Sequence, residues 1–209
     1  MRAEGCRYVR VSTGLDDAHA PARRAYEKAG FSHTLPDVDY FMPLRDAITG
    51  TDPCMRPAAE ADVERACDIA VQAWTPIRVI FRENHLGELY SPFFDGWQAS
   101  KRASVARAMR GGRGYVAEVE GRVAGFISYT VNPEKKSAEI GENAVDSSMR
   151  GHGIGGKQYA CIFDRMRAEG IEYVKVHTGL DDGHAPARRA YEKAGFDKRI
   201  PHVTYYRAL

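Results

Sequence analysis

The sequence predicts an α/β fold in which a mixed β-sheet carries helices on both faces. First, three strand-like segments at 114–119, 123–131 and 138–145 follow one another through short turns, as in antiparallel hairpins. Second, helix and strand patterns then alternate up to the C-terminus, which favours a parallel crossover. Third, a glycine-rich loop at 151–155 joins these two regions. Together they indicate one sheet with both antiparallel and parallel neighbours.

The other elements follow from periodicity and from breaking residues. A short strand at 55–58 precedes an amphipathic helix at 58–74, which Pro76 is expected to end or interrupt. A second helix at 97–109 ends at two glycines. After the glycine loop, the pattern predicts a helix at 156–169, a buried strand at 173–177, a helix at 185–194 capped by Gly195, and final strands at Phe196 and 203–206.

Composition limits the classes of function. The 209 residues are 44% hydrophobic and 28% charged with a net charge of +2, so nothing favours nucleic acid or membranes as partners. No apolar run could span a bilayer, and the first ten residues lack the apolar core of a signal peptide. We expect a cytoplasmic protein without a metal, because no histidine pair or cysteine spacing resembles a metal site. The cysteines, interpreted as reduced thiols, are Cys6, Cys54, Cys67 and Cys161.

The chain contains an internal repeat. Residues 1–44 and 166–209 align without gaps and are identical at 30 of 44 positions. Nothing in the first copy matches the glycine-rich loop. We therefore predict a partial duplicate at 1–46, a linker at 47–53 that is rich in turn-forming residues, and a complete domain at 54–209.

The glycine-rich loop is a candidate anion site. Glycines allow close approach of the backbone to a ligand, and N–H groups at a helix N-terminus attract an anion such as a pyrophosphate. The alternative is a tight strand-to-helix turn. The loop is neither a nucleotide P-loop nor a dinucleotide fingerprint, because its spacing fits neither pattern. Its residues are Arg150, Gly151, His152, Gly153, Ile154 and Gly155.

The segment 77–97 is rich in aromatic and acidic residues. Most of its aromatic side chains are expected to pack in the core or against helices. The other interpretation is that this segment, between two helices, forms a wall of a substrate pocket.

Two motifs together resemble the GCN5-related N-acetyltransferases, the GNAT superfamily. Residues 150–155, RGHGIG, match the Q/R-x-x-G-x-G/A motif, and residues 184–196, HAPARRAYEKAGF, resemble the helix that ends in Y-E-K-x-G-F. The resemblance covers about 53–209. It implies a mostly antiparallel sheet with helices on both faces and a V-shaped splay between the fourth and fifth strands of the domain.

The resemblance also implies roles for individual residues, with acetyl-CoA as co-substrate. The backbone of Ala144 and Val145 would pair with the pantetheine arm, and the N–H groups of 150–155 would hold the pyrophosphate. Tyr191 matches the tyrosine that protonates the leaving thiolate. His184 stands where the family often has an asparagine that contacts the pantetheine, so this position departs from the pattern.

Transfer to an amine needs a base, because a primary amine is mostly protonated at neutral pH. The candidates are Glu139 and Glu142 on the strand at 138–145. Their spacing predicts that they face opposite sides of the sheet, so that only one reaches the substrate. Glu139 is favoured because it resembles the catalytic glutamate of histone-type members. Glu142 remains the alternative where the strand bulges, and each could also be a solvated strand residue.

The resulting expectation is transfer of acetyl from acetyl-CoA to the primary amine of a small molecule by direct attack. The alternatives are a protein or peptide N-acetyltransferase and a non-catalytic acyl-CoA-binding module. Residues 1–44 lack the glycine loop, so we expect one active site per chain. They could dock within the chain as an intrachain pseudo-dimer, exchange between chains to form a homodimer, or be a relic of a lost copy.

Overall fold

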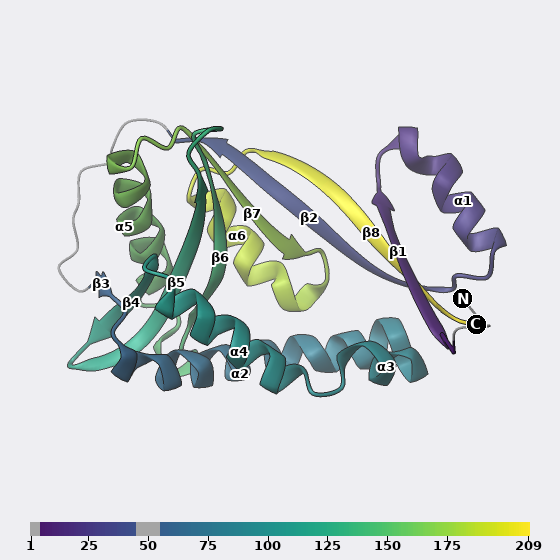
Figure 1. The fold of residues 1–209 in the computed structure, drawn as a ribbon, viewed down its shortest axis with the longest axis horizontal. Helices are drawn as coiled ribbons and strands as arrows, with labels where there is room; N and C mark the ends of the chain where they lie inside the picture. The colour runs from purple at the N-terminus through teal and green to yellow at the C-terminus, as the bar shows by residue number, and fades with distance from the viewer. Residues whose placement is uncertain (1–4, 45–54) are drawn as a thin grey trace.

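The computed structural model describes residues 5–44 and 55–209, and all of its strands belong to one sheet (Figure 1). The strands are β1 (Tyr8–Gly14), β2 (His33–Pro43), β3 (Met55–Pro57), β4 (Gly114–Val119), β5 (Arg122–Asn132), β6 (Ser137–Val145), β7 (Tyr173–Gly179) and β8 (Lys198–Ala208). The helices are α1 (Ala20–Lys28), α2 (Val63–Ile80), α3 (Tyr90–Phe94), α4 (Trp97–Arg110), α5 (Ile154–Ala168) and α6 (Ala185–Lys193).

The strand order in the sheet is β1-β8-β2-β7-β6-β5-β4-β3. Neighbouring strands are antiparallel except β6 and β7, which are parallel. The predicted class, a mixed and mostly antiparallel sheet with flanking helices, is therefore confirmed.

Helices cover both faces of the sheet and form separate cores (Figure 1). α2 and α4 pack on one face, where Ile69 and Val105 meet Phe126 of β5. α5 and α6 pack on the other, where Ile162 and Tyr191 belong to a core with β2, β6 and β7. A third apolar cluster joins the segment after α2 to the strands β2 and β8.

Several predicted boundaries are wrong, and α2 begins at Val63 rather than at residue 58, after a 3-10 turn at Glu60–Asp62. α2 does not end at Pro76 but runs to Ile80 and continues into a π-helical turn, Phe81–Leu86. Pro76 cannot bond the carbonyl of Gln72, but both residues are exposed, so water can satisfy that carbonyl. The strands predicted at the C-terminus are a single strand, β8, and Phe196 is a buried core residue just before it.

The repeated segments lie side by side in the sheet. β2 of the first copy is inserted between β7 and β8 of the second, and β1 pairs with the outer edge of β8. β1 pairs with β8 in the same register in which β7 pairs with β2, so an approximate twofold axis relates the copies. On this axis Asp37 lies opposite His202, its own equivalent in the other copy.

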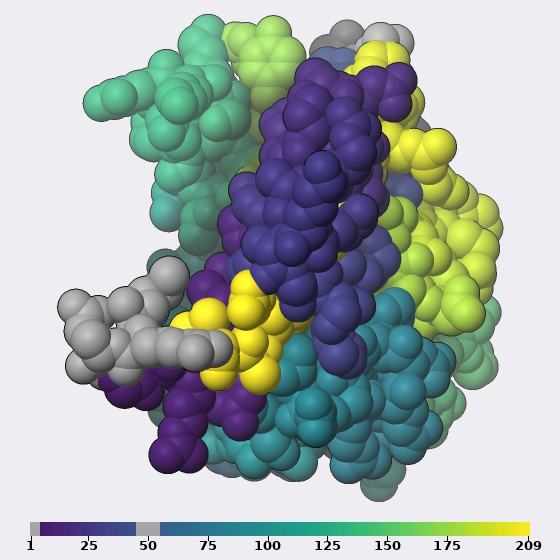
Figure 2. Space-filling view, turned by 90° about the vertical axis from the view of Figure 1, so that its right-hand side faces the viewer, coloured from purple at the N-terminus to yellow at the C-terminus, as the bar shows by residue number. Residues whose placement is uncertain are grey.

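The environments of the repeated helices differ. α6 buries Tyr191, whereas α1, with the same nine residues, has no buried residue. Figure 2 shows α1 standing on the outside of the molecule, at the end that carries β1 and the end of β8. The linker predicted at 47–53 lies outside the described residues. Within the described ranges, no helix combines the length and the apolar character that crossing a membrane requires.

Candidate functional site

The site begins where β6 and β7 separate. Their parallel pairing extends only to Ile140, opposite Val176. Beyond that point, residues 141–145 of β6 have no partner on the β7 side in the described sheet, while residues 143–145 remain paired with β5. The pairing with β5 shifts register between Ile127 and Tyr129. The separation leaves free strand edge on which an extended ligand can form hydrogen bonds.

Ala144 and Val145 lie in this open segment and line a cleft of about 1350 Å³. The strand is followed by Asp146, whose carboxylate accepts a hydrogen bond of 2.9 Å from the Ser148 N–H and pairs with Arg65. Hydrogen bonds from Ser148, followed by the contact with Arg65, lower the pKa of Asp146 despite its burial. Contacts of Asp146 with Ser148 and with Arg65 thus stabilise the turn between β6 and the glycine loop.

The glycine loop follows and opens α5. Gly151 and Gly153 have φ values of +85° and +77°, and Gly153 is the residue at the helix start. Positive φ is costly for other residues, which explains the glycines. Arg150, Gly151, Gly153, Ile154 and Gly155 line the cleft. His152 does not line the cleft. Its ring Nδ1 lies 3.1 Å from the Arg150 carbonyl oxygen, a contact that stabilises the loop.

Tyr191 projects from α6 into the floor of the cleft. It is 3% exposed, and its ring lies 5.7 Å from that of Tyr159 and 6.0 Å from that of Tyr40. Burial raises the pKa of Tyr191, against the opposing effect of hydrogen bonds with Asn143 and Tyr159. Its hydroxyl is therefore protonated at neutral pH. Tyr159 also donates to the Asn143 side chain at 3.3 Å, which connects this group to the open segment of β6.

His184 lines the cleft beside the ring of Phe81, and its Nδ1 lies 2.6 Å from Asp181. Burial acts to raise the pKa of Asp181, but the interactions with His184 outweigh it, so the pKa lies below its ordinary value. The pairing leaves Nε2 as the ring nitrogen available to a ligand. The first copy has the same pair, His19 and Asp16 at 2.8 Å, on the exposed α1 side. The repeated sequence therefore encodes the pair locally, whether or not a cleft is present.

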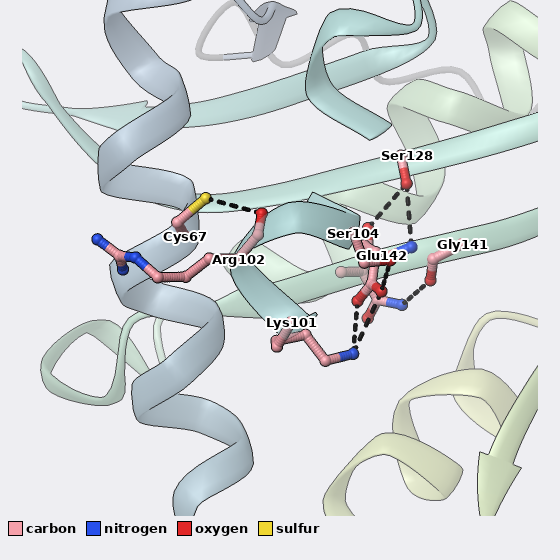
Figure 3. Close-up of polar contacts among 8 residues, drawn as sticks. Cys67, Lys101, Arg102, Ser104, Ser128, Gly141 and Glu142 are labelled. Atoms are coloured by element: carbon pink, nitrogen blue, oxygen red, sulfur yellow. Dashed lines mark hydrogen bonds and ion pairs between the residues drawn. The ribbon is translucent and has the colours of Figure 1, made fainter. Parts of the chain in front are cut away.

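Glu142 is held by three groups (Figure 3). Its carboxylate oxygens lie 3.0 and 3.2 Å from Lys101 Nζ, and Ser104 donates to one of them at 2.8 Å. Its backbone N–H donates to the Ser128 hydroxyl at 3.0 Å. Lys101 and Ser104 belong to α4, so the carboxylate faces the side of the sheet that α2 and α4 cover.

Glu139 faces the same side, and the expectation that the two glutamates lie on opposite faces is wrong. The register shift in β6 adds one residue between them and restores the same orientation. Both carboxylates line the cleft. Glu139, however, lies in the part of β6 still paired with β7, where it forms an ion pair of 3.2 Å with Lys175.

The N-terminal copy also lines the cleft, through Arg10, Leu35, Pro36 and Asp37. Burial raises the pKa of Asp37, and the nearby His177 and His202 partly offset this increase. The neighbouring Asp39 lies 3.1 Å from His177 and 3.4 Å from His202. Across residues 5–44 and 55–209, no group of three or more acidic, histidine or cysteine side chains is arranged to bind a metal.

The aromatic segment after α2 contributes to both a wall and a core. Phe81 and Phe94 line the cleft, and they also pack with Phe93 and Trp97 against the third apolar cluster. Both interpretations of the segment 77–97 therefore describe part of it. Arg78 lies between these rings and was not singled out by any sequence pattern, because a lone arginine at the end of an amphipathic helix is common.

Comparison with known proteins agrees with this architecture. The family described as "Acetyltransferase (GNAT) family" matches residues 80–196. A mycothiol acetyltransferase of Brachybacterium faecium is 36% identical over 62 residues, which are 30% of this chain and 18% of that protein. This chain thus spans less than a fifth of that relative.

Two solved structures share the fold at low identity. A GCN5-related N-acetyltransferase of Sphaerobacter thermophilus has a TM-score of 0.63 at 16% identity, over 97% of this chain and 60% of that one. The PaiA N-acetyltransferase of Thermoplasma acidophilum, in complex with coenzyme A, has a TM-score of 0.52 at 14% identity, over 70% and 96%. The family match covers more than half of the chain and includes the open strand, the glycine loop and the tyrosine helix, so this protein belongs to the GNAT family of acetyltransferases, which use acetyl-CoA.

Proposed function

We propose that this protein transfers the acetyl group of acetyl-CoA to the primary amine of a small molecule by direct attack. The observation that carries the proposal is that one cleft combines a free strand edge, a glycine loop at a helix N-terminus, and a buried tyrosine. The free edge of 141–145 suits the pantetheine arm, and the loop 150–155 suits the pyrophosphate. We assign His184 Nε2 to contact with the arm.

Each chemical requirement has a candidate residue. Acetyl-CoA supplies a thioester, whose carbon–sulfur bond breaks as the amine nitrogen bonds to the carbonyl carbon. A backbone N–H of the open strand, that of Val145, polarises the carbonyl oxygen. Tyr191 donates its proton to the leaving thiolate, and a glutamate takes a proton from the attacking amine, directly or through a water.

The experiment that tests this function has two steps. Binding of acetyl-CoA is measured by calorimetry, and release of free thiol is then followed with a panel of small amines and with basic peptides. Thiol release with small amines is the expected result. Release with peptides alone would favour a protein acetyltransferase, and binding without release on any acceptor would favour a non-catalytic module.

Gly153→Val provides the binding control. A β-branched residue at a φ of +77° strains the loop, and its side chain would extend into open space of the cleft where the ligand would lie. We expect acetyl-CoA binding to be lost. Gly170→Val is the matched variant, because Gly170 has a φ of +76° and equally open surroundings but does not line the cleft. Retained binding in Gly153→Val would contradict the pyrophosphate assignment.

The base is assigned by a paired substitution. Glu142 lies in the open part of β6, whereas Glu139 lies in the paired part, so we assign the base to Glu142. Glu142→Gln is expected to lower kcat/KM about 100-fold, and Glu139→Gln to change it less than about threefold. The reverse order in steady-state assays would return the role to Glu139.

A further inference from the structure

Arg78 lines the cleft from the C-terminal end of α2, whereas Arg65, near the N-terminal end of the same helix, pairs with Asp146 beside the glycine loop. Arg78 belongs to the last turn of α2, and its guanidinium lies between three aromatic rings. The guanidinium carbon is 5.3, 4.7 and 5.5 Å from the ring centroids of Phe81, Phe94 and Trp97. These contacts fix the plane of the side chain, and they supply no hydrogen-bond acceptor to its N–H groups.

Two polar atoms of Arg78, Nε and Nη1, are buried without a hydrogen-bond partner among the described residues. Burial lowers the pKa of Arg78, and the other groups that influence it are the tyrosines Tyr90 and Tyr206, with no carboxylate among them. Unpaired buried charge is expensive, so a site that keeps it is expected to receive an anion.

Other arginines of the same helical layer show the contrast. Arg65 on α2 pairs with Asp146, and Arg102 on α4 pairs with Asp68 at 2.7 Å. A carboxylate thus neutralises each of these two arginines. Arg78 differs in that it lines the cleft while its Nε and Nη1 are buried without a hydrogen-bond partner in the described ranges.

The position of Arg78 relative to the candidate base indicates which molecule would supply the anion. Arg78 lines the main cleft and also a recess of about 250 Å³, which Lys101, Ser104 and Glu142 share. Two carboxylates line the recess: Glu142 is already paired with Lys101 at 3.0 Å, and Asp95 is exposed and forms no ion pair with Arg78 in the described ranges. Arg78 is therefore the cation left for a ligand in this recess. An anion bound there would lie beside Glu142, and thus belong to the acceptor.

We propose that Arg78 binds a carboxylate of the acceptor, so that the acceptor is an amino acid or another small amine that carries a carboxylate. A guanidinium matches the planar carboxylate with two parallel hydrogen bonds. Asp37 and Glu142 also line the cleft, together with cations such as Arg10 and Arg107, so the cleft carries charges of both signs that suit a ligand with one carboxylate and one ammonium group. The same carboxylates suit the ammonium end of the acceptor. The inference rests on the proposed acetyl transfer to an amine.

The test compares amino acids with their own carboxamides. Each pair keeps the side chain and the position of the amine, and the carboxamide lacks the negative charge at the site of recognition. We expect the wild-type protein to release thiol with the carboxylates at a kcat/KM about 10- to 100-fold higher than with the carboxamides. Arg78→Met should remove this preference by lowering kcat/KM for the carboxylates alone, because methionine keeps the apolar contacts with the rings.

Controls separate recognition from folding. Arg82→Met removes an exposed arginine one turn away, which is paired with Glu83 at 3.6 Å and does not line the cleft, and it should keep the preference. Acetyl-CoA binding by calorimetry should be unchanged in Arg78→Met, and Arg78→Lys should restore part of the preference.

The outcomes distinguish the two proposals. Equal or faster reaction of the carboxamides in the wild type, or a preference that survives Arg78→Met, would overturn the role of Arg78 and leave acetyl transfer to amines intact. Binding of acetyl-CoA without thiol release from any amine, charged or not, would overturn the proposed function and this inference together.

Discussion

Deletion of residues 1–50 is expected to cost the protein its folded C-terminal region. β8 has β1 and β2 as its neighbours in the described sheet, and both lie in the deleted segment. Without them β8 has no strand beside it, and β7 loses its outer neighbour. We expect the shortened chain to be aggregated or associated through the exposed strand edges.

Burial gives the size of the effect. Val38 and Leu35 of β2 are 0% and 7% exposed. Burying each contributes roughly 1.5–3 kcal/mol, so the two together are comparable with a large part of a net stability of about 5–15 kcal/mol. A loss of that size corresponds to a fall in Tm of roughly 10–20 °C for a chain of this length.

Thermal unfolding by circular dichroism and mass in solution measure this effect. Val38→Asp is the companion variant, because it disrupts β2 without removing the segment and should also lower Tm. A soluble, active and equally stable shortened chain would support the relic interpretation. The mass of the full-length chain distinguishes the other two interpretations of residues 1–44. Docking within the chain gives a monomer, and exchange between chains gives a dimer.

Substitution of Tyr191 by phenylalanine is expected to lower kcat about 100-fold, with little change in acetyl-CoA affinity. The hydroxyl is removed while the ring keeps its contacts with Tyr40, Tyr159 and Phe196. Because burial raises the pKa of Tyr191, the wild-type hydroxyl stays protonated through neutral pH. A loss of kcat below pH 8 in the wild type would therefore have to come from another group.

The repeat supplies a control for Tyr191. Tyr26 occupies the equivalent position in α1, within the same helix sequence, but does not line the cleft. Tyr26→Phe should keep wild-type kcat in the thiol-release assay. If Tyr191→Phe and Tyr26→Phe had the same kcat as the wild type, Tyr191 would have no role as the acid.

Sequence patterns predicted the fold well because its signals are local. Hydrophobic periodicity and glycine caps placed β4 at its observed bounds, and α4 and α6 within one residue of theirs. The end of α2 was wrong because solvent exposure of Pro76 and Gln72, which decides whether the helix can continue, is a tertiary property. The single C-terminal strand was missed for a similar reason, since its length depends on pairing with both β1 and β2.

The site could be predicted only in part. The glycine loop and Tyr191 belong to contiguous motifs, but the orientation of Glu142 depends on a register shift that strand periodicity does not contain. Arg78 has no sequence signal. Comparison of the two copies did contain a signal for two other residues. His177 stands where the first copy has Ser12, and Asp37 stands where the second copy has His202. Asp37 and His177 both line the cleft.

The position of Asp37 opposite His202 affects how the contact between the two copies can change by mutation. In a homodimer built around a true twofold axis, a residue on the axis meets itself, and one mutation alters both sides at once. An acid opposite a base is then unattainable there. With both copies encoded in one polypeptide, each side mutates independently. The axis can therefore hold complementary partners, and one side can acquire residues that face a substrate while the other keeps only those that hold the sheet together.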